Sequence, residues 1–147
     1  PWEQRPAVNV YLAGPDFVDV DTASIDTVAE ALRYHNFQVH LPIRENGRAG
    51  PETPPSRRNA LARKDLQLLH ECQMVVAVLP FDDPGTLLEI GAGIERGMPV
   101  LVYSPQPVTN LMLEGLPTLV TDDVDELIGG VFQAAAAIGE RSPSDDV

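Results

Sequence analysis

The sequence lacks several features that would assign it to a specific class. Cys72 is the only cysteine among 147 residues, so neither an intrachain disulfide nor a cysteine-based zinc site can form. No stretch reaches the ~18 consecutive apolar residues that a membrane span needs. We therefore expect a cytoplasmic protein without membrane insertion. We expect Cys72 to be a buried small apolar residue rather than a nucleophile.

Basic residues are also scarce. Ten Lys and Arg residues stand against 22 Asp and Glu residues, and the formal net charge is -12. Binding to a nucleic acid polymer depends on clusters of Lys and Arg, so this charge argues against such a partner. The hydrophobic content of 44% and the length predict one packed domain over residues 1–147. We expect residues 1–7 and 140–147 to be frayed termini.

Several common ligand motifs are missing. There is no G-x-G-x-x-G for a dinucleotide and no G-x-x-x-x-G-K-[ST] for a nucleoside triphosphate. No pair of histidines has metal-ligand spacing, and no G-x-S-x-G is present. We therefore expect no cofactor and no metal, and carboxylates are the remaining candidates for chemistry.

Apolar, β-branched runs alternate with helical patterns along the chain, which is typical of an α/β domain with a parallel sheet. Strands are predicted over residues 8–14, 37–42, 74–80, 100–103 and 118–120, helices over 22–36, 57–71, 86–96 and 123–138, and a long loop over 43–56. The predicted fold is a flavodoxin-like (Rossmann-like) doubly wound sheet of five mainly parallel strands flanked by helices. Ligands bind beyond the carboxyl ends of such strands, which selects residues 14–17, 81–86 and 104–112.

One of these segments is rich in acid. Asp82, Asp83 and Glu89 surround the start of the predicted helix over 86–96. The structural interpretation is a capping box, with Thr86 as the N-cap and Glu89 bonding back to its amide. The functional interpretation is that Glu89, near the positive end of a helix dipole, is an ionised nucleophile for the anomeric carbon of a sugar. The pattern leaves both open.

The chain resembles the nucleoside 2-deoxyribosyltransferase family. The matching pieces span residues 8–115 in the family's order. They are Tyr11-Leu12-Ala13-Gly14-Pro15 with Phe17, Asp65, Asp83-Pro84-Gly85-Thr86-Leu87-Leu88-Glu89-Ile90-Gly91 with Ala92, Gly97-Met98-Pro99-Val100, and Asn110-Leu111-Met112. The acidic segment that ends in Glu-Ile-Gly, combined with Asn-Leu-Met, is the most specific part of the match.

The resemblance implies a role for each matching residue. Glu89 is similar to the family's nucleophile, Tyr11 to the tyrosine that orients it, and Asp83 to the acid that protonates or hydrogen-bonds the leaving base. Asp65 corresponds to the aspartate that contacts the sugar hydroxyls. From the residues alone, Tyr11 can also be a core-facing aromatic of the strand, and a solvated helix face beside Lys64 is the favoured interpretation of Asp65.

Four further residues are predicted to bind substrate. Gly14 would allow a close backbone approach, and Phe17 would either stack on the base or pack in the core. The resemblance implies that Asn110 and Met112 reach into a neighbouring subunit's site; the alternative is an ordinary loop followed by a core methionine. The expected assembly is therefore a homo-oligomer, a dimer or a multiple of dimers.

The implied reaction transfers a 2-deoxyribosyl group between purine or pyrimidine bases. It is a retaining double displacement through a covalent glycosyl-Glu89 intermediate, and its partners are nucleosides and free nucleobases. One alternative is an N-glycoside hydrolase of nucleoside 5′-monophosphates, with Ser56, Arg57 and Arg58 as a phosphate site. Another is a non-catalytic nucleotide-binding module.

Two features set this chain apart within the resemblance. Asp16 occupies a position after Pro15 where an apolar or aromatic residue would be usual, and it adds a charge near the site. The loop over residues 43–56 is expected to cover the base. Arg44, Glu45 and Asn46 are the candidates in that loop for contacting it.

Overall fold

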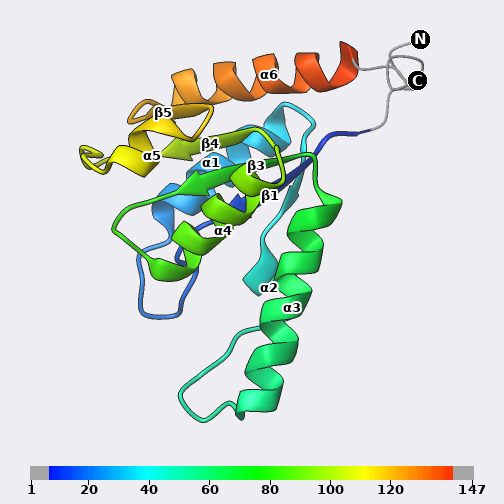
Figure 1. Cartoon of the computed structure of the whole chain (residues 1–147), viewed down its shortest axis with the longest axis vertical. Coiled ribbons are helices and arrows are strands. Elements are labelled where there is room, and N and C mark those ends of the chain that lie inside the picture. Colours follow the sequence, from blue (N-terminus) through cyan, green and yellow to red (C-terminus); the bar gives the residue numbers. More distant parts are fainter. Residues whose placement is uncertain (1–6, 141–147) are drawn as a thin grey trace.

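The computed structural model describes residues 7–140 and contains a five-stranded parallel sheet (Figure 1). The strands are β1 (Asn9–Ala13), β2 (Gln38–His40), β3 (Met74–Val78), β4 (Val100–Tyr103) and β5 (Leu119–Thr121). Their order is β2-β1-β3-β4-β5, and every neighbouring pair is parallel. This is the flavodoxin-like doubly wound order, so the predicted fold class is confirmed.

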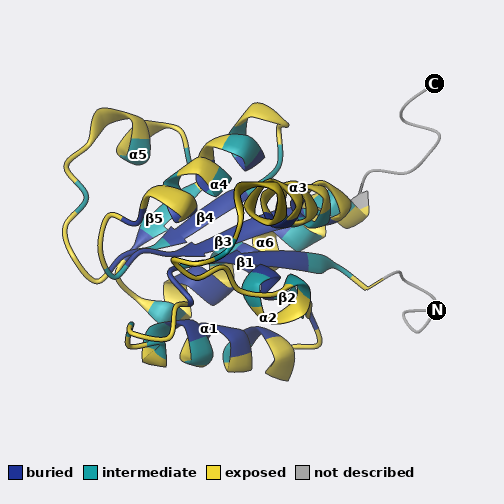
Figure 2. Cartoon of the chain, turned by 90° about the horizontal axis from the view of Figure 1, so that it is seen from below, coloured by how far each residue is buried: buried dark blue, intermediate teal, exposed yellow. Residues whose placement is uncertain are grey.

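Four long helices cover the two faces of the sheet. α1 (Ala23–Tyr34) and α6 (Val124–Glu140) pack on one face, and α3 (Pro55–Glu71) and α4 (Pro84–Glu95) pack on the other. Figure 2 shows the buried strands between α1 on one side and the α3–α4 pair on the other. No helix within residues 7–140 is long and apolar enough to cross a membrane. The frayed termini predicted over residues 1–7 and 140–147 lie outside the described part of the chain except for Ala7 and Glu140, and Glu140 is the last residue of α6.

Two short helices differ from the prediction. α2 (Pro42–Asn46) lies where a loop was predicted, and α5 (Leu111–Gly115) lies in the connection after β4. Pro42 begins α2, and the Asn110 side chain caps α5 by accepting bonds from two backbone N–H groups. Helices of five residues are too short to show the 3.6-residue periodicity by which longer helices are recognised.

Side chains along β1 alternate between the two faces of the sheet, as they must in any strand. Val10 and Leu12 pack with α1 and α6, whereas Tyr11 and Ala13 face α3 and α4. β3 is buried along its whole length because helices cover both of its faces. The alternation in β1 is what turns Tyr11 toward α4.

From β1 the strand order proceeds outward to β2 on one side, and from β3 it proceeds outward to β4 and β5 on the other, so the winding of the sheet reverses between β1 and β3. The chain leaves β1 for α1 on one face and leaves β3 for α4 on the other. The carboxyl ends of these two strands are therefore the place where folds of this topology bind their ligands. Gly14 closes the end of β1. A Cβ atom there would lie 2.9 Å from Cδ1 of Ile25, so glycine allows α1 to pack this closely.

The first half of α3 and residues 47–54 project away from the body of the molecule (Figure 1). Only Leu61 and Leu69 are buried along the 17 residues of α3. Residues 47–64 form a basic arm with a net charge of +4, in a chain whose net charge is -12. Its charged residues are Arg48, Glu52, Arg57, Arg58, Arg63 and Lys64.

Candidate active site

A hydrogen bond between Tyr11 and Glu89 forms the centre of the site. Tyr11 lies on β1 and is fully buried, and its hydroxyl donates to Oε2 of Glu89 on α4. Burial raises the pKa of Tyr11 well above its usual value, and the neighbouring Glu89 carboxylate raises it further. The tyrosine therefore keeps its proton and remains a hydrogen-bond donor to the carboxylate.

The carboxyl group of Glu89 has a raised pKa. Burial raises the pKa of its carboxyl group to about 7, the hydrogen bond from Tyr11 opposes this rise, and the charges of Asp65 and Asp83 add to it. Only Oε2 is bonded. Since no unbonded side-chain oxygen is buried within residues 7–140, Oε1 remains accessible to solvent. The site thus presents one open carboxylate oxygen on a group that ionises near neutral pH.

Asp83 caps α4, and this overturns the capping-box interpretation. Thr86 lies inside the helix and donates its backbone N–H (3.0 Å) and its hydroxyl (2.6 Å) to Oδ2 of Asp83. Pro84 follows Asp83 and occupies the first helical turn, where proline is favoured, so the helix begins earlier than predicted. Glu89 bonds Tyr11 instead of a backbone amide of the cap, so it does not serve as a capping residue.

Asp65 approaches Glu89 from α3. Its carboxyl group is partly buried, which raises its pKa, and the Nδ2 amide of Asn46 donates to its Oδ1 at 3.0 Å, which lowers it. The structure therefore brings together four of the predicted residues: Tyr11, Glu89, Asp65 and Asp83. Asn46 joins them through a bond across 19 residues of sequence that no local pattern signals.

The side chains of α2 have protein partners. The Arg44 guanidinium donates to the buried Asp16 carboxylate at 2.8 and 3.1 Å and to Asp26 at 2.8 Å. Glu45 pairs with His40 at 3.0 Å, and Asn46 bonds Asp65. These contacts hold α2 in place, and contact of its side chains with a base stays a prediction. The charge of Asp16, which looked out of place in the sequence, is balanced by Arg44.

Phe17 lies in the loop between β1 and α1 and is 46% exposed. Packing in the core is therefore excluded for this ring, and stacking on a base stays a prediction. Gly14 has a packing requirement, given above, and its contact with a substrate also stays a prediction.

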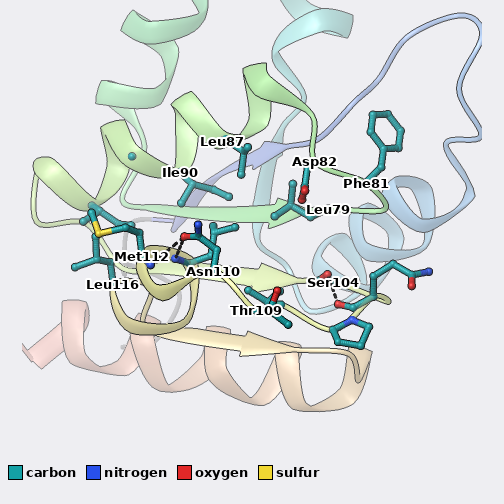
Figure 3. A pocket seen from close by; sticks show the side chains of 16 residues that line it. Leu79, Phe81, Asp82, Leu87, Ile90, Ser104, Thr109, Asn110, Met112 and Leu116 are labelled. Atoms are coloured by element: carbon teal, nitrogen blue, oxygen red, sulfur yellow. Dashed lines mark hydrogen bonds between the residues drawn. The ribbon is translucent and has the colours of Figure 1, made fainter.

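Asn110 and Met112 lie apart from the Tyr11–Glu89 pair. They line a cavity of about 410 Å³ between α4 and residues 104–116, together with Leu87, Ile90 and Ile94 of α4 (Figure 3). Glu89 does not line this cavity, because it points from another face of α4 toward Tyr11. Within one chain, these two residues are therefore not assembled with the Tyr11–Glu89 pair.

Two other predictions concern cysteine and metals. Cys72 is buried, and burial raises the pKa of its thiol to about 12, so the apolar role predicted for it is confirmed. Across residues 7–140, no three His, Cys, Asp or Glu side chains are grouped in a way that could hold a metal ion.

A protein-family model matches the part of the chain that contains the site residues. The family model described as nucleoside 2-deoxyribosyltransferase matches residues 10–121, which include Tyr11, Asp65, Asp83 and Glu89. No curated protein sequence matches the chain significantly.

Solved structures share the fold. A 2-deoxyribosyltransferase from the psychrotolerant bacterium Bacillus psychrosaccharolyticus aligns with a TM-score of 0.72 at 23% identity, over 82% of this chain and 90% of that one. A conserved protein from Enterococcus faecalis V583 aligns with a TM-score of 0.69 at 24% identity, over 87% and 99%. A CMP N-glycosidase from Clostridium botulinum aligns with a TM-score of 0.52 at 15% identity, over 84% and 97%.

The raised pKa of Glu89 predicts how stability changes with pH. A carboxyl group whose pKa rises from 4.5 to about 7 on folding contributes stability below pH 4.5 that is lost as the pH rises through 7. Glu89→Gln removes the charge and keeps an oxygen that can accept the Tyr11 bond. We expect it to exceed the wild type at pH 8 by up to about 3 kcal/mol in free energy of unfolding.

Most of the stability advantage of Glu89→Gln should disappear at pH 5. Urea unfolding of both proteins at pH 5 and pH 8 measures this change. Glu95→Gln is the matched control, because Glu95 is exposed on the same helix. A Glu89→Gln variant whose stability relative to the wild type is the same at pH 5 and pH 8 would contradict the buried-carboxylate account.

Proposed function

The chain belongs to the nucleoside 2-deoxyribosyltransferase family, and on this premise we propose that it transfers a 2-deoxyribosyl group from a nucleoside to a free nucleobase. The observation that carries the proposal is the hydrogen bond between Tyr11 on β1 and Glu89 on α4, the helix that follows β3. The free thiol of Cys72 fits a reducing compartment, and we propose cytoplasmic nucleoside salvage as the setting.

In the first step, Oε1 of ionised Glu89 attacks the anomeric carbon of the nucleoside. An ester bond forms, the bond from that carbon to the base nitrogen breaks, and its electron pair leaves with the base. The Tyr11 hydroxyl holds Oε2 and orients the attacking oxygen. Thr86 occupies Oδ2 of Asp83, so Oδ1 is the oxygen left to protonate or hydrogen-bond the departing base.

In the second step, a nitrogen of the incoming base attacks the same carbon and the ester bond to Glu89 breaks. The incoming base gives one proton to Oδ1 of Asp83, which replaces the proton that Asp83 gave to the departing base, and the Glu89 carboxylate is restored. Two inversions at one carbon give net retention and ping-pong kinetics. Asp65 contacts the sugar hydroxyls, and Phe17 stacks on the base, as the family resemblance implies.

The burial of Glu89 argues against a purely structural, nucleotide-binding role. A capping carboxylate would lie at the helix start and stabilise the fold, whereas Glu89 lies away from the cap and has a raised pKa. A group whose ionised form is destabilised at neutral pH is typical of a reacting site rather than of a structural one.

The helix caps and the pairing of Arg44 and Arg58 favour a neutral nucleoside over a nucleoside monophosphate. Helix N-termini are the usual places for a phosphate, but Asp83 caps α4, and Asp21 accepts the first N–H of α1. Arg44 is already paired with two carboxylates, and Arg58 bonds the carbonyl groups of Gly50 and Thr53. Hydrolysis of monophosphates, the activity named for the Clostridium botulinum neighbour, is the competing outcome of the test below.

We also propose that the working unit is a homo-oligomer in which Asn110 and Met112 complete a neighbour's site. Leu111 and Met112 are 81% and 60% exposed, so both side chains are available for contact with a second subunit. The Asn110 Oδ1 caps α5, which leaves its Nδ2 amide available to another chain. The basic arm is opposite in charge to the rest of the chain, which favours contact between copies.

Base exchange tests the proposed reaction directly. The wild type, incubated with deoxyinosine and adenine or cytosine, should form a new deoxynucleoside that chromatography detects. Glu89→Gln should lower this rate by about 10³-fold or more, because the amide cannot displace the base. Glu95→Gln should exchange bases at the wild-type rate.

Other outcomes would reject the proposal. Release of free base from deoxycytidine monophosphate without a new nucleoside would assign hydrolysis instead of transfer. A Glu89→Gln variant with near wild-type exchange would remove Glu89 from the mechanism.

Mixing two inactive variants tests the shared site. Asn110→Asp keeps the oxygen that caps α5 but removes the amide donor, so it should fold and lose exchange activity. A mixed dimer of one Asn110→Asp subunit and one Glu89→Gln subunit contains one site in which both Glu89 and Asn110 are intact. Refolding an equal mixture should therefore restore roughly a quarter of the wild-type activity. A mixture that stays inactive, or an Asn110→Asp variant that is fully active alone, would contradict a shared site.

A further inference from the structure

Asn46 occupies the last position of α2 and faces the candidate site. Its Nδ2 amide donates to Oδ1 of Asp65 at 3.0 Å, and this is the hydrogen bond that the Asp65 side chain makes within residues 7–140. Both side chains are partly buried. The contact joins α2 to α3.

We propose that Asn46 is a positioning residue that fixes the Asp65 carboxylate for binding the sugar. This inference rests on the proposed function, since it assumes that Asp65 contacts the sugar hydroxyls. An aspartate on a helix has a broad, roughly two-fold torsion about its last bond, so its two oxygens exchange places readily. A donor on Oδ1 selects one orientation and leaves Oδ2 for a hydroxyl group.

The bond also keeps Asp65 in the right charge state. Partial burial raises the pKa of Asp65, and the amide of Asn46 counteracts that rise by donating to the ionised form. An ionised carboxylate accepts the stronger hydrogen bond from a sugar hydroxyl. Loss of Asn46 therefore affects both the direction and the charge of the carboxylate.

Asn46 is itself held firmly. Arg44, two residues earlier, ties α2 to Asp16 in the loop after β1 and to Asp26 on α1. Glu45 bonds His40 on β2, whose other ring nitrogen lies 2.9 Å from Oδ1 of Asn9 on β1. α2 is thus anchored to the loop after β1, to α1 and to β2. A short helix held at three places is a rigid support for the Asn46 amide, which fixes the position of Asp65 relative to the sheet.

A double-mutant cycle on base exchange tests the inference. We would measure kcat/KM for deoxyinosine with the wild type, Asn46→Ala, Asp65→Ala and the double variant. Asn46→Ala should lower kcat/KM by about tenfold, largely through a higher KM, and should cause no further loss in the Asp65→Ala background. Asn46→Asp has the shape of asparagine, so it should fold, and it should lose at least as much activity because it places a second carboxylate against Asp65.

The matched control is Asn59→Ala. Asn59 lies on the exposed side of α3, where its Oδ1 accepts from Arg63. This variant should exchange bases like the wild type, which separates a general effect on the arm from an effect on Asp65.

Three results would overturn the inference while the proposed function stands. They are losses that add up in the double variant, wild-type kcat/KM in both Asn46 variants, and an Asp65→Ala variant as active as the wild type. Failure of the proposed function is a different result, because then the wild type forms no new nucleoside.

Discussion

The candidate site depends on one partly buried carboxylate that a tyrosine holds in place. Glu89 is partly withdrawn from water between α4 and β1, and this burial makes its charge costly. Tyr11 offsets part of this cost with its hydroxyl, and Asp65 and Asp83 act against ionisation through their charges. The balance leaves a carboxyl group that ionises near neutral pH and has one oxygen free. A group in this state is suited to attack an anomeric carbon and to leave again.

The fold supplies this arrangement through a few general rules. Alternation along β1 turns Tyr11 toward α4, and Asp83 together with Pro84 sets where α4 begins, which places Glu89 beside the tyrosine. The short α2 ties the neighbouring loop to α3 through Arg44 and Asn46. Part of the acidic excess noted in the sequence is explained by local contacts: Asp16 pairs with Arg44, Asp65 accepts from Asn46, and Asp83 caps α4. The basic arm separates charge along the chain.

The parallel sheet could be predicted from the sequence because apolar runs such as 74–80 persist through a buried strand. Glu89, Tyr11, Asp65 and Asp83 were identified because their motif resembles a family. The features that the sequence did not predict were missed for physical reasons. α2 and α5 are single helical turns without periodicity, and Asp83 displaced Thr86 as the cap because proline begins the helix. The bonds from Arg44 to Asp16 and from Asn46 to Asp65 join residues 28 and 19 positions apart, which no local pattern encodes.

The pH dependence of kcat/KM for base exchange, compared between the wild type and Tyr11→Phe, tests the central claim most directly. This ratio reports ionisation in the free enzyme, and the attack needs ionised Glu89. The wild-type rate should therefore fall as the pH drops below about 7. Tyr11→Phe removes the bond that lowers the pKa of Glu89, so its acid limb should move to higher pH. Acid limbs that coincide in the two proteins would contradict the account.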